Sequence, residues 1–376
     1  MLQFSPDAAL VLSDGSFFMG KGLGLRQPLA GEICFNTAMT GYQEVMTDPS
    51  YAEQLVVFSC PHIGNVGCND LDYESSNTHV RGIVLGDMPT VASNYRARHD
   101  FLDWLQSKGV AGICAVDTRQ VIRKIAASGQ PLQAMIRQFD GSPSATDIQQ
   151  VVEEMNSSLS LSGQNLVDAV TTSEIQVFDN SIIPNAPKIA VIDYGVKDSI
   201  LWNLEAYSCP ITLFPASASI ESVLQCNPQG VLLSNGPGDP RALGAQHYKL
   251  VQNLLQTRLP VMGICFGYQM LALALGAKIE QMPTGHHGVN HPVFDLLQQK
   301  VVITSQNHEF AVLRTSLPEN LEATHVSLFD GSLAGVHCKN RPIFGVQFHP
   351  EASPGPHEAR YLFDNFMDLV QAHAQT

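Results

Sequence analysis

The second half of the chain alternates short apolar runs with stretches in which apolar residues recur every three or four positions. The apolar runs lie in KIAVIDYG (188–195), ITLFP (211–215), GVLLSNGPGDP (230–240) and PVMGI (260–264). Helical patterns fall between them, around Ile200, Leu204 and Leu250. Apolar strands separated by helices are typical of βαβ units. We therefore predict an α/β domain over residues 188–376, with a central, mostly parallel sheet covered by helices on both faces.

The first 141 residues have a different pattern, in which glycine and proline interrupt short apolar runs. The segments ALVLSDGSFFMGKG (9–22) and RGIVLGDMP (81–89) are examples. Such runs are typical of strands joined by turns. We predict a separate first domain, α/β or β-rich, over residues 1–141.

Residues 142–187 are rich in Ser, Thr, Asn and Gln, and we predict a connector that contains one helix. Thr146 and Gln149 have the spacing of a capping box at the start of this helix. The apolar residues of one helical face follow, at Ile148, Val151, Val152 and Met155. We expect this face to pack against a domain.

Composition narrows the classes of function. The chain has 376 residues, 44% hydrophobic, with a formal charge of −14 and a pI near 5.3. An acidic chain without clustered Lys and Arg is a poor match to binders of nucleic acid or anionic membranes. It has no run of about 20 apolar residues and no basic region followed by an apolar core near its start. Eight scattered cysteines without a C-x-x-C pair fit a reducing compartment, so we expect a cytoplasmic protein.

The segment PVMGICFGYQ (260–269) holds Cys265 between Gly263 and Gly267, where a predicted strand meets a predicted helix. Gly-x-Cys-x-Gly resembles the nucleophile elbow, in which a sharp turn exposes the reactive atom and small neighbours avoid clashes. The free N–H groups of the following helix point toward the sulfur and favour a thiolate. Most cysteines in apolar surroundings are core residues, so a catalytic role also needs a base.

The segment GVQFHPEASPGP (345–356) supplies a candidate base, His349, two residues before Glu351. Alternate residues of an extended segment point to the same side, so the carboxylate can hold the imidazole and stabilise the imidazolium. Cys265, His349 and Glu351 therefore form a candidate triad. Taken singly, His349 is more often a loop histidine at a strand end, and Glu351 a solvated surface carboxylate.

The loop SNGPGDP (234–240) follows a predicted strand and offers glycine N–H groups for an oxyanion hole. Gly236 is the candidate donor on this loop, and Phe266, next to Cys265, is the second. Loops at the carboxyl ends of parallel strands meet at one edge of the sheet. The composition of the loop is equally typical of a tight turn.

These motifs resemble those of class I glutamine amidotransferases, and nearly the whole chain is similar to the small subunit of carbamoyl-phosphate synthase. The second half carries SNGPGDP, GICFGYQ, GHHGVNHP, TSQNHEF and GVQFHPEASPGP. The first half carries FNTAMTGYQEVMTDPSY, PHIGNVGCN and AVDTRQVIRKI. The first half decides the subtype, because other amidotransferases of the class share the glutaminase motifs and lack this domain.

The resemblance implies that Cys265 attacks the side-chain amide of L-glutamine, that His349 shuttles the proton that lets ammonia leave, and that water releases glutamate from a thioester. It places the negative oxygen of the intermediates against the N–H groups of Gly236 and Phe266. The implied glutamine contacts are Ser50, Gly236, Gly238, Phe266, Gln269, Asn307, Glu309 and Phe310.

The resemblance also implies a partner, the large subunit of the synthase, which receives the ammonia through an internal passage. That subunit makes carbamoyl phosphate from bicarbonate and ATP, for arginine or pyrimidine synthesis. This chain has no Gly-x-x-x-x-Gly-Lys-Ser/Thr sequence and little positive charge. We therefore expect no cofactor on this chain, and ATP and Mg on the large subunit.

Glu309 departs from the family pattern, which usually has glycine there. If the backbone needed a positive φ, a side chain would cost about 1 kcal/mol. We expect Glu309→Gly to change glutamine affinity more than turnover. The histidines of GHHGVNH, at 286, 287 and 291, do not predict a metal site, because adjacent histidines point apart and no further ligands accompany them. A non-catalytic scaffold and a cysteine peptidase or other thiol hydrolase are the alternative functions.

Overall fold

The computed structural model describes residues 5–157, 165–184 and 186–375. The chain divides into two units, Met1–Ser162 with Pro283–His287 and Gly163–Met282 with Gly288–Thr376. The segment 142–187, which we expected to be a connector, is divided between them. The helix in this segment belongs to the first unit, where it packs on strands.

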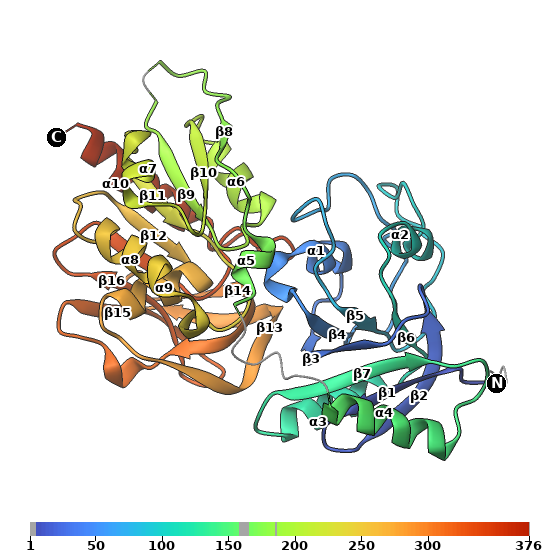
Figure 1. Cartoon of the computed structure of the whole chain (residues 1–376). Helices are drawn as coiled ribbons and strands as arrows, with labels where there is room; N and C mark the ends of the chain where they lie inside the picture. The colour runs from blue at the N-terminus through green and yellow to red at the C-terminus, as the bar shows by residue number, and fades with distance from the viewer. Residues whose placement is uncertain (1–4, 158–164, 185, 376) are drawn as a thin grey trace. The chain divides into compact units, whose positions relative to one another are not determined.

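The first unit is built on a closed barrel of seven strands (Figure 1). The strands are β1 (Ala8–Leu12), β2 (Phe17–Leu23), β3 (Leu29–Asn36), β4 (Gln54–Phe58), β5 (Gly82–Val84), β6 (Gly112–Cys114) and β7 (Leu132–Gln138). The helices are α1 (Tyr42–Thr47), η1 (Pro49–Tyr51), α2 (Phe101–Ser107), α3 (Thr118–Ala127) and α4 (Ala145–Ser157). The order around the barrel is β1-β2-β6-β5-β4-β3-β7, with parallel pairing from β3 through β4 and β5 to β6. A β-rich first domain that also carries helices agrees with the prediction.

Side chains of the barrel strands alternate between two environments, as the period of a strand requires. On β1, Leu10 and Leu12 pack in one buried cluster together with residues of α3. Ala9 and Val11 face the other way and pack against α4. The predicted apolar face of α4 is confirmed, because Ile148, Val151, Val152 and Met155 form its contact with these strands.

The start of α4 corrects the predicted capping box. The helix begins at Ala145, so the cap is Ser144 rather than Thr146. The Ser144 hydroxyl accepts from the Asp147 N–H at 3.2 Å, and the Asp147 carboxylate accepts from the Ser144 N–H at 2.7 Å. This is the reciprocal arrangement of a capping box, two residues earlier than predicted: Asp147 has the role that we assigned to Gln149.

The second unit contains one sheet of ten strands, in the order β14-β13-β15-β16-β17-β12-β11-β9-β10-β8. The strands are β8 (Gln176–Phe178), β9 (Ile189–Asp193), β10 (Ile211–Pro215), β11 (Gly230–Leu233), β12 (Val261–Ile264), β13 (Ile279–Asp295), β14 (Lys300–Val312), β15 (Leu321–Ser327), β16 (Leu333–Cys338) and β17 (Ile343–Val346). The five central strands, from β17 to β10, are parallel. β8 pairs antiparallel with β10, and antiparallel pairing also joins β17 to β16, β16 to β15 and β15 to β13. The predicted parallel sheet therefore forms the centre of the unit.

Helices cover both faces of this central sheet (Figure 1). The helices are α5 (Val167–Val170), α6 (Asp198–Glu205), α7 (Ile220–Gln225), η2 (Pro240–Ala242), α8 (Ala245–Leu254), α9 (Phe266–Ala274), η3 (Arg314–Ser316) and α10 (Tyr361–Ala374). On β9, Ala190 and Ile192 pack with α7, α8 and α9, whereas Ile189 and Val191 pack with α6 and α10. Within the residues that the structure describes, none of the helices has the length and apolarity needed to cross a bilayer.

Candidate active site

Cys265 occupies the turn between β12 and α9. Its backbone has φ 51° and ψ −102°, a conformation that a residue with a side chain rarely adopts. The Cys265 N–H donates to the Val346 carbonyl at 2.8 Å, so the turn is anchored to β17. Strain of this kind persists only where the surroundings impose it, and it is concentrated at functional sites.

The two glycines of the Gly-x-Cys-x-Gly segment are needed for the close approach of backbone atoms. A Cβ on Gly267 would lie 2.1 Å from the Leu233 carbonyl oxygen on β11. A Cβ on Gly263 would lie 2.7 Å from the Tyr268 nitrogen. Either side chain would force the strand and the helix apart and would move the turn that holds the thiol.

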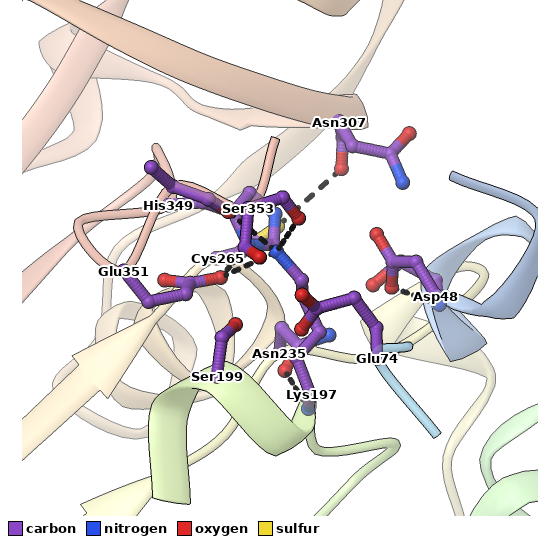
Figure 2. A network of polar contacts seen from close by, with 12 residues as sticks. Asp48, Glu74, Lys197, Ser199, Asn235, Cys265, Asn307, His349, Glu351 and Ser353 are labelled. Carbon is purple, nitrogen blue, oxygen red and sulfur yellow. Dashed lines mark hydrogen bonds and ion pairs between the residues drawn. The ribbon is translucent and has the colours of Figure 1, made fainter. Parts of the chain in front are cut away.

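His349 and Glu351 lie beyond the carboxyl end of β17 and meet in the arrangement that the alternation of an extended segment predicts (Figure 2). The His349 Nδ1–H donates to the Glu351 Oε1 at 2.6 Å. The His349 backbone is held by its N–H donating to the Ser305 carbonyl at 2.9 Å. Because Nδ1 is bound to the carboxylate, Nε2 is the nitrogen left for proton transfer. Nε2 is buried.

A buried lysine completes this group, and sequence reasoning missed it. Lys197 is 2% exposed, and its ammonium donates to Glu351 Oε1 at 3.1 Å (Figure 2). It also donates to the carbonyls of Ala352 at 2.7 Å and Ser353 at 2.9 Å. The signal in the sequence is a lysine four residues after an apolar strand, at the edge of the sheet where Cys265 and His349 also lie.

The charges of this group support one another. Burial disfavours an imidazolium, but the Glu351 carboxylate and Cys265 outweigh burial and raise the pKa of His349. Burial would raise the pKa of Glu351, but the Lys197 ammonium and His349 more than offset it and lower that pKa. The pair is therefore a carboxylate and an imidazolium at neutral pH.

The glycine loop after β11 lies against the start of α9. The Ser234 carbonyl accepts from the Gly267 N–H at 2.9 Å, which ties the loop to the Cys265 turn. A Cβ on Gly236 would lie 2.3 Å from the Tyr194 carbonyl oxygen, so the loop runs close to the end of β9. The Phe266 N–H is in the first turn of α9, where a helix offers no carbonyl partner. Gly238 has a positive φ of 81° on the same loop.

The expected glutamine contacts Asn307 and Gln269 lie next to Cys265, and Phe310 contacts Gln269. The Cys265 thiol donates to the Asn307 carbonyl at 3.5 Å. Gln269 is one helical turn after Cys265 and is 2% exposed. Its side-chain Nε2 donates to the Phe310 carbonyl at 2.8 Å.

Glu309 and Ser50 have different surroundings from these. Glu309 is half-buried in β14 and does not have a positive φ, so the backbone there does not require glycine and the expected strain is absent. Ser50 belongs to the first unit, in η1, where its N–H donates to the Asp48 carboxylate at 2.8 Å. Among the described parts of the chain, no group of three or more His, Cys, Asp or Glu side chains is suited to hold a metal ion.

Two family models match the chain. The model of the carbamoyl-phosphate synthase small chain, CPSase domain, matches residues 10–136, and that of glutamine amidotransferase class-I matches residues 190–369. The carbamoyl phosphate synthase small chain of Caulobacter vibrioides is 46% identical over 377 residues, which cover 96% of each protein. That of Escherichia coli (strain K12) is 43% identical over 382 residues, 98% of each. That of Ruegeria pomeroyi is 46% identical over 378 residues, 98% of this chain and 97% of that protein.

Proposed function

Because the chain belongs to the family of carbamoyl phosphate synthase small chains, we propose that it is the glutamine-hydrolysing subunit of that enzyme, with Cys265, His349 and Glu351 as its catalytic residues. The observation that carries the proposal is the strained Cys265 at a strand–helix junction, in the same unit as the buried His349–Glu351 ion pair. A thiol, a base and a group that orients the base are the parts that nucleophilic catalysis by cysteine requires.

The first step is attack by the Cys265 thiolate on the side-chain amide carbon of glutamine. A carbon–sulfur bond forms, and the carbonyl electron pair moves onto oxygen. The oxyanion lies against the N–H groups of Gly236 and Phe266, which belong to the two segments that the Ser234–Gly267 hydrogen bond holds together. When the carbonyl re-forms, the carbon–nitrogen bond breaks. The nitrogen takes the Nε2 proton of the His349 imidazolium and leaves as ammonia.

Hydrolysis of the thioester reverses these roles. Neutral His349 takes a proton from water, and the water oxygen bonds to the thioester carbon. A second oxyanion forms at the same N–H groups, and the carbon–sulfur bond breaks as it collapses. The product leaves as a side-chain carboxylic acid, which loses its proton to solvent water to give glutamate, and the thiolate and imidazolium are restored. Glu351 and Lys197 hold the imidazole in one tautomer and orientation during both steps.

The remaining assignments follow from family membership. Gly238, Gln269, Asn307, Glu309 and Phe310 are the proposed glutamine contacts in the second unit, and Ser50 is the proposed contact from the first. The partner is the large subunit, which uses the ammonia with bicarbonate, ATP and Mg to make carbamoyl phosphate for arginine or pyrimidine synthesis. We place the protein in the cytoplasm, where its eight free cysteines stay reduced.

The test is release of glutamate and ammonia from L-glutamine by the full chain, alone and with its large subunit. Wild type releases both in equal amounts, and Cys265→Ser loses at least about a thousandfold in rate. Cys226→Ser is the matched control. The Cys226 thiol donates to the Val223 carbonyl in α7 and has no role in the proposed site, so this variant should retain activity. Hydrolysis of peptides but not glutamine would replace the proposal with a thiol hydrolase. No turnover by wild type under either condition would replace it with a scaffold.

A further inference from the structure

Gln347 is a buried amide beside the reactive sulfur, and the proposed triad does not account for it. It lies directly after β17, is 1% exposed, and its backbone N–H donates to the Ala334 carbonyl. In this extended segment, Val346 and Phe348 point into the apolar cluster under α6 and α10. Gln347 and His349 alternate with them and face the other side. A polar residue therefore occupies a position enclosed by protein, next to Cys265.

The orientation of the Gln347 amide is set by a second buried glutamine. Gln269 Nε2 donates to the Gln347 Oε1 at 3.1 Å and to the Phe310 carbonyl at 2.8 Å. Because the Gln347 oxygen accepts from Gln269, its NH₂ group is turned toward the sulfur. Gln347 Nε2 donates to the Cys265 Sγ at 3.6 Å. A buried amide with this pair of bonds has one favoured orientation, since reversing it would bring two NH₂ groups together.

The partners of the sulfur differ in what they offer to its two charge states. A neutral thiol donates to the Asn307 carbonyl oxygen at 3.5 Å. A thiolate has no proton to donate, so that oxygen then repels it. The Gln347 N–H suits the thiolate, because hydrogen bonds to a charged acceptor are stronger than those to a neutral one. Loss of the proton therefore weakens the contact with Asn307 and strengthens the contact with Gln347.

We propose that Gln347 is a thiol-positioning residue, whose amide N–H holds the Cys265 sulfur beside His349 and stabilises it as a thiolate. This inference rests on the proposed function, because it concerns the same thiol. The charged groups that act on the site are His349, Glu351 and Lys197, and these are unchanged in every variant of the test.

The test measures how fast iodoacetamide alkylates Cys265 in the full chain as a function of pH, with the Cys265 peptide followed by mass spectrometry. Gln347→Met keeps a similar length and removes the donor, so the midpoint pH of alkylation rises by about one unit, a tenfold loss of thiolate at lower pH. Gln347→Glu keeps an acceptor for Gln269 but puts a carboxylate oxygen where the donor was. Its midpoint rises further, because a neighbouring negative charge disfavours a thiolate.

Gln229→Met is the matched control. Gln229 also makes two side-chain hydrogen bonds, accepting from the Lys188 N–H and donating to the Asn227 carbonyl, but it precedes β11 and so lies at the opposite end of the sheet. Gln229→Met removes a comparable amide and should leave the midpoint pH of Cys265 alkylation unchanged. If Gln347→Met fails to fold by circular dichroism, Gln347→Glu carries the test. Equal midpoints in wild type and a folded Gln347 variant would overturn the proposal.

Glutaminase kinetics separate this inference from the proposed function. If the function is right, Gln347→Glu, which keeps an acceptor for Gln269, lowers kcat at least about tenfold and leaves KM for glutamine nearly unchanged, because the lost donor acts on the thiol. A raised KM with unchanged kcat would overturn the positioning role. Alkylation needs no substrate, so it still reports on Gln347 if wild type proves inactive on glutamine.

Discussion

Replacing Lys197 with methionine tests whether the buried ammonium neutralises the carboxylate of Glu351. Lys197 is 2% exposed, and its ammonium lies 3.1 Å from the Glu351 Oε1. Lys197→Met keeps the length of the side chain and removes the charge and three donated hydrogen bonds. The variant leaves a fully buried carboxylate with only His349 to balance it.

The size of the effect follows from the geometry. Two unit charges 3.1 Å apart attract by about 5 kcal/mol at an effective dielectric constant near 20. Desolvation of both groups offsets part of this attraction when the pair forms, but removing one partner leaves the other charge buried, at a cost of about 3–5 kcal/mol. The carbonyls of Ala352 and Ser353 also lose their donor. We expect Lys197→Met to lower the free energy of unfolding of the second unit by about 3–5 kcal/mol.

The assay must report on the second unit alone, because two units need not unfold together. The chain has two tryptophans, Trp104 in α2 and Trp202 in α6, and α6 starts directly after Lys197. In a Trp104→Phe background, the fluorescence of Trp202 during urea denaturation follows the second unit. Lys249→Met, at an exposed position on α8, is the matched control and should change the free energy by less than about 0.5 kcal/mol.

A double variant separates loss of charge balance from loss of packing. In Lys197→Met with Glu351→Gln, neither charge is buried, and the amide oxygen introduced at position 351 still accepts from His349. The double variant should be more stable than Lys197→Met alone, because replacing both members of a buried pair costs less than removing one. The reasoning is refuted if Lys197→Met unfolds within about 1 kcal/mol of wild type, or if the two substitutions destabilise additively.

Two further predictions concern backbone packing and pH. Gly267→Ala should lower the free energy of unfolding of the second unit, measured in urea, by about 1–3 kcal/mol, because its Cβ would lie 2.1 Å from the Leu233 carbonyl oxygen. Gly141→Ala is the control and should be neutral, because there is open space around Gly141. Equal effects of the two substitutions would contradict the packing argument. Burial lowers the pKa of His325 from 6.5 to about 4, although the nearby Asp295 carboxylate acts in the opposite direction. The unfolded chain thus binds more protons between these values, so the free energy of unfolding should fall by up to about 3 kcal/mol as pH drops from 6.5 to 4. In His325→Asn, the free energy of unfolding should depend less on pH over this range. A pH dependence equal to that of wild type would show that His325 is not its origin.

The parallel sheet and the turn at Cys265 could be predicted because their determinants are local. β9, β11 and β12 are short runs that are apolar almost throughout and buried at every position, which is the pattern of a strand buried on both faces. Gly263 and Gly267 flank Cys265 within one short segment, and each is needed for a contact that a Cβ would block. A prediction that rests on so few neighbouring residues depends little on the rest of the chain.

The start of α4 could not be placed to the residue, because two overlapping frames satisfy the same rule. Ser144 with Asp147 and Thr146 with Gln149 both fit a cap followed three residues later by a side chain that reaches back. The structure selects the earlier frame, in which the helix begins at Ala145. Positions of helix ends depend on such small differences, whereas the apolar face of α4 depends on four residues together.

Lys197 and Gln347 could not be assigned from local pattern, because their partners are 154 and 82 positions away in the sequence. From the sequence alone, a lysine after a strand is expected to be exposed to solvent, and a single glutamine belongs to no recognisable motif. The sheet nevertheless restricts where to look. Most of the side chains described at the site come from the few residues after β9, β11, β12 and β17, which are four of the five parallel strands at the centre. Once those strands are recognised, every polar residue within a few positions after them is a candidate for the site, and Lys197 and Gln347 meet that condition as Cys265 does.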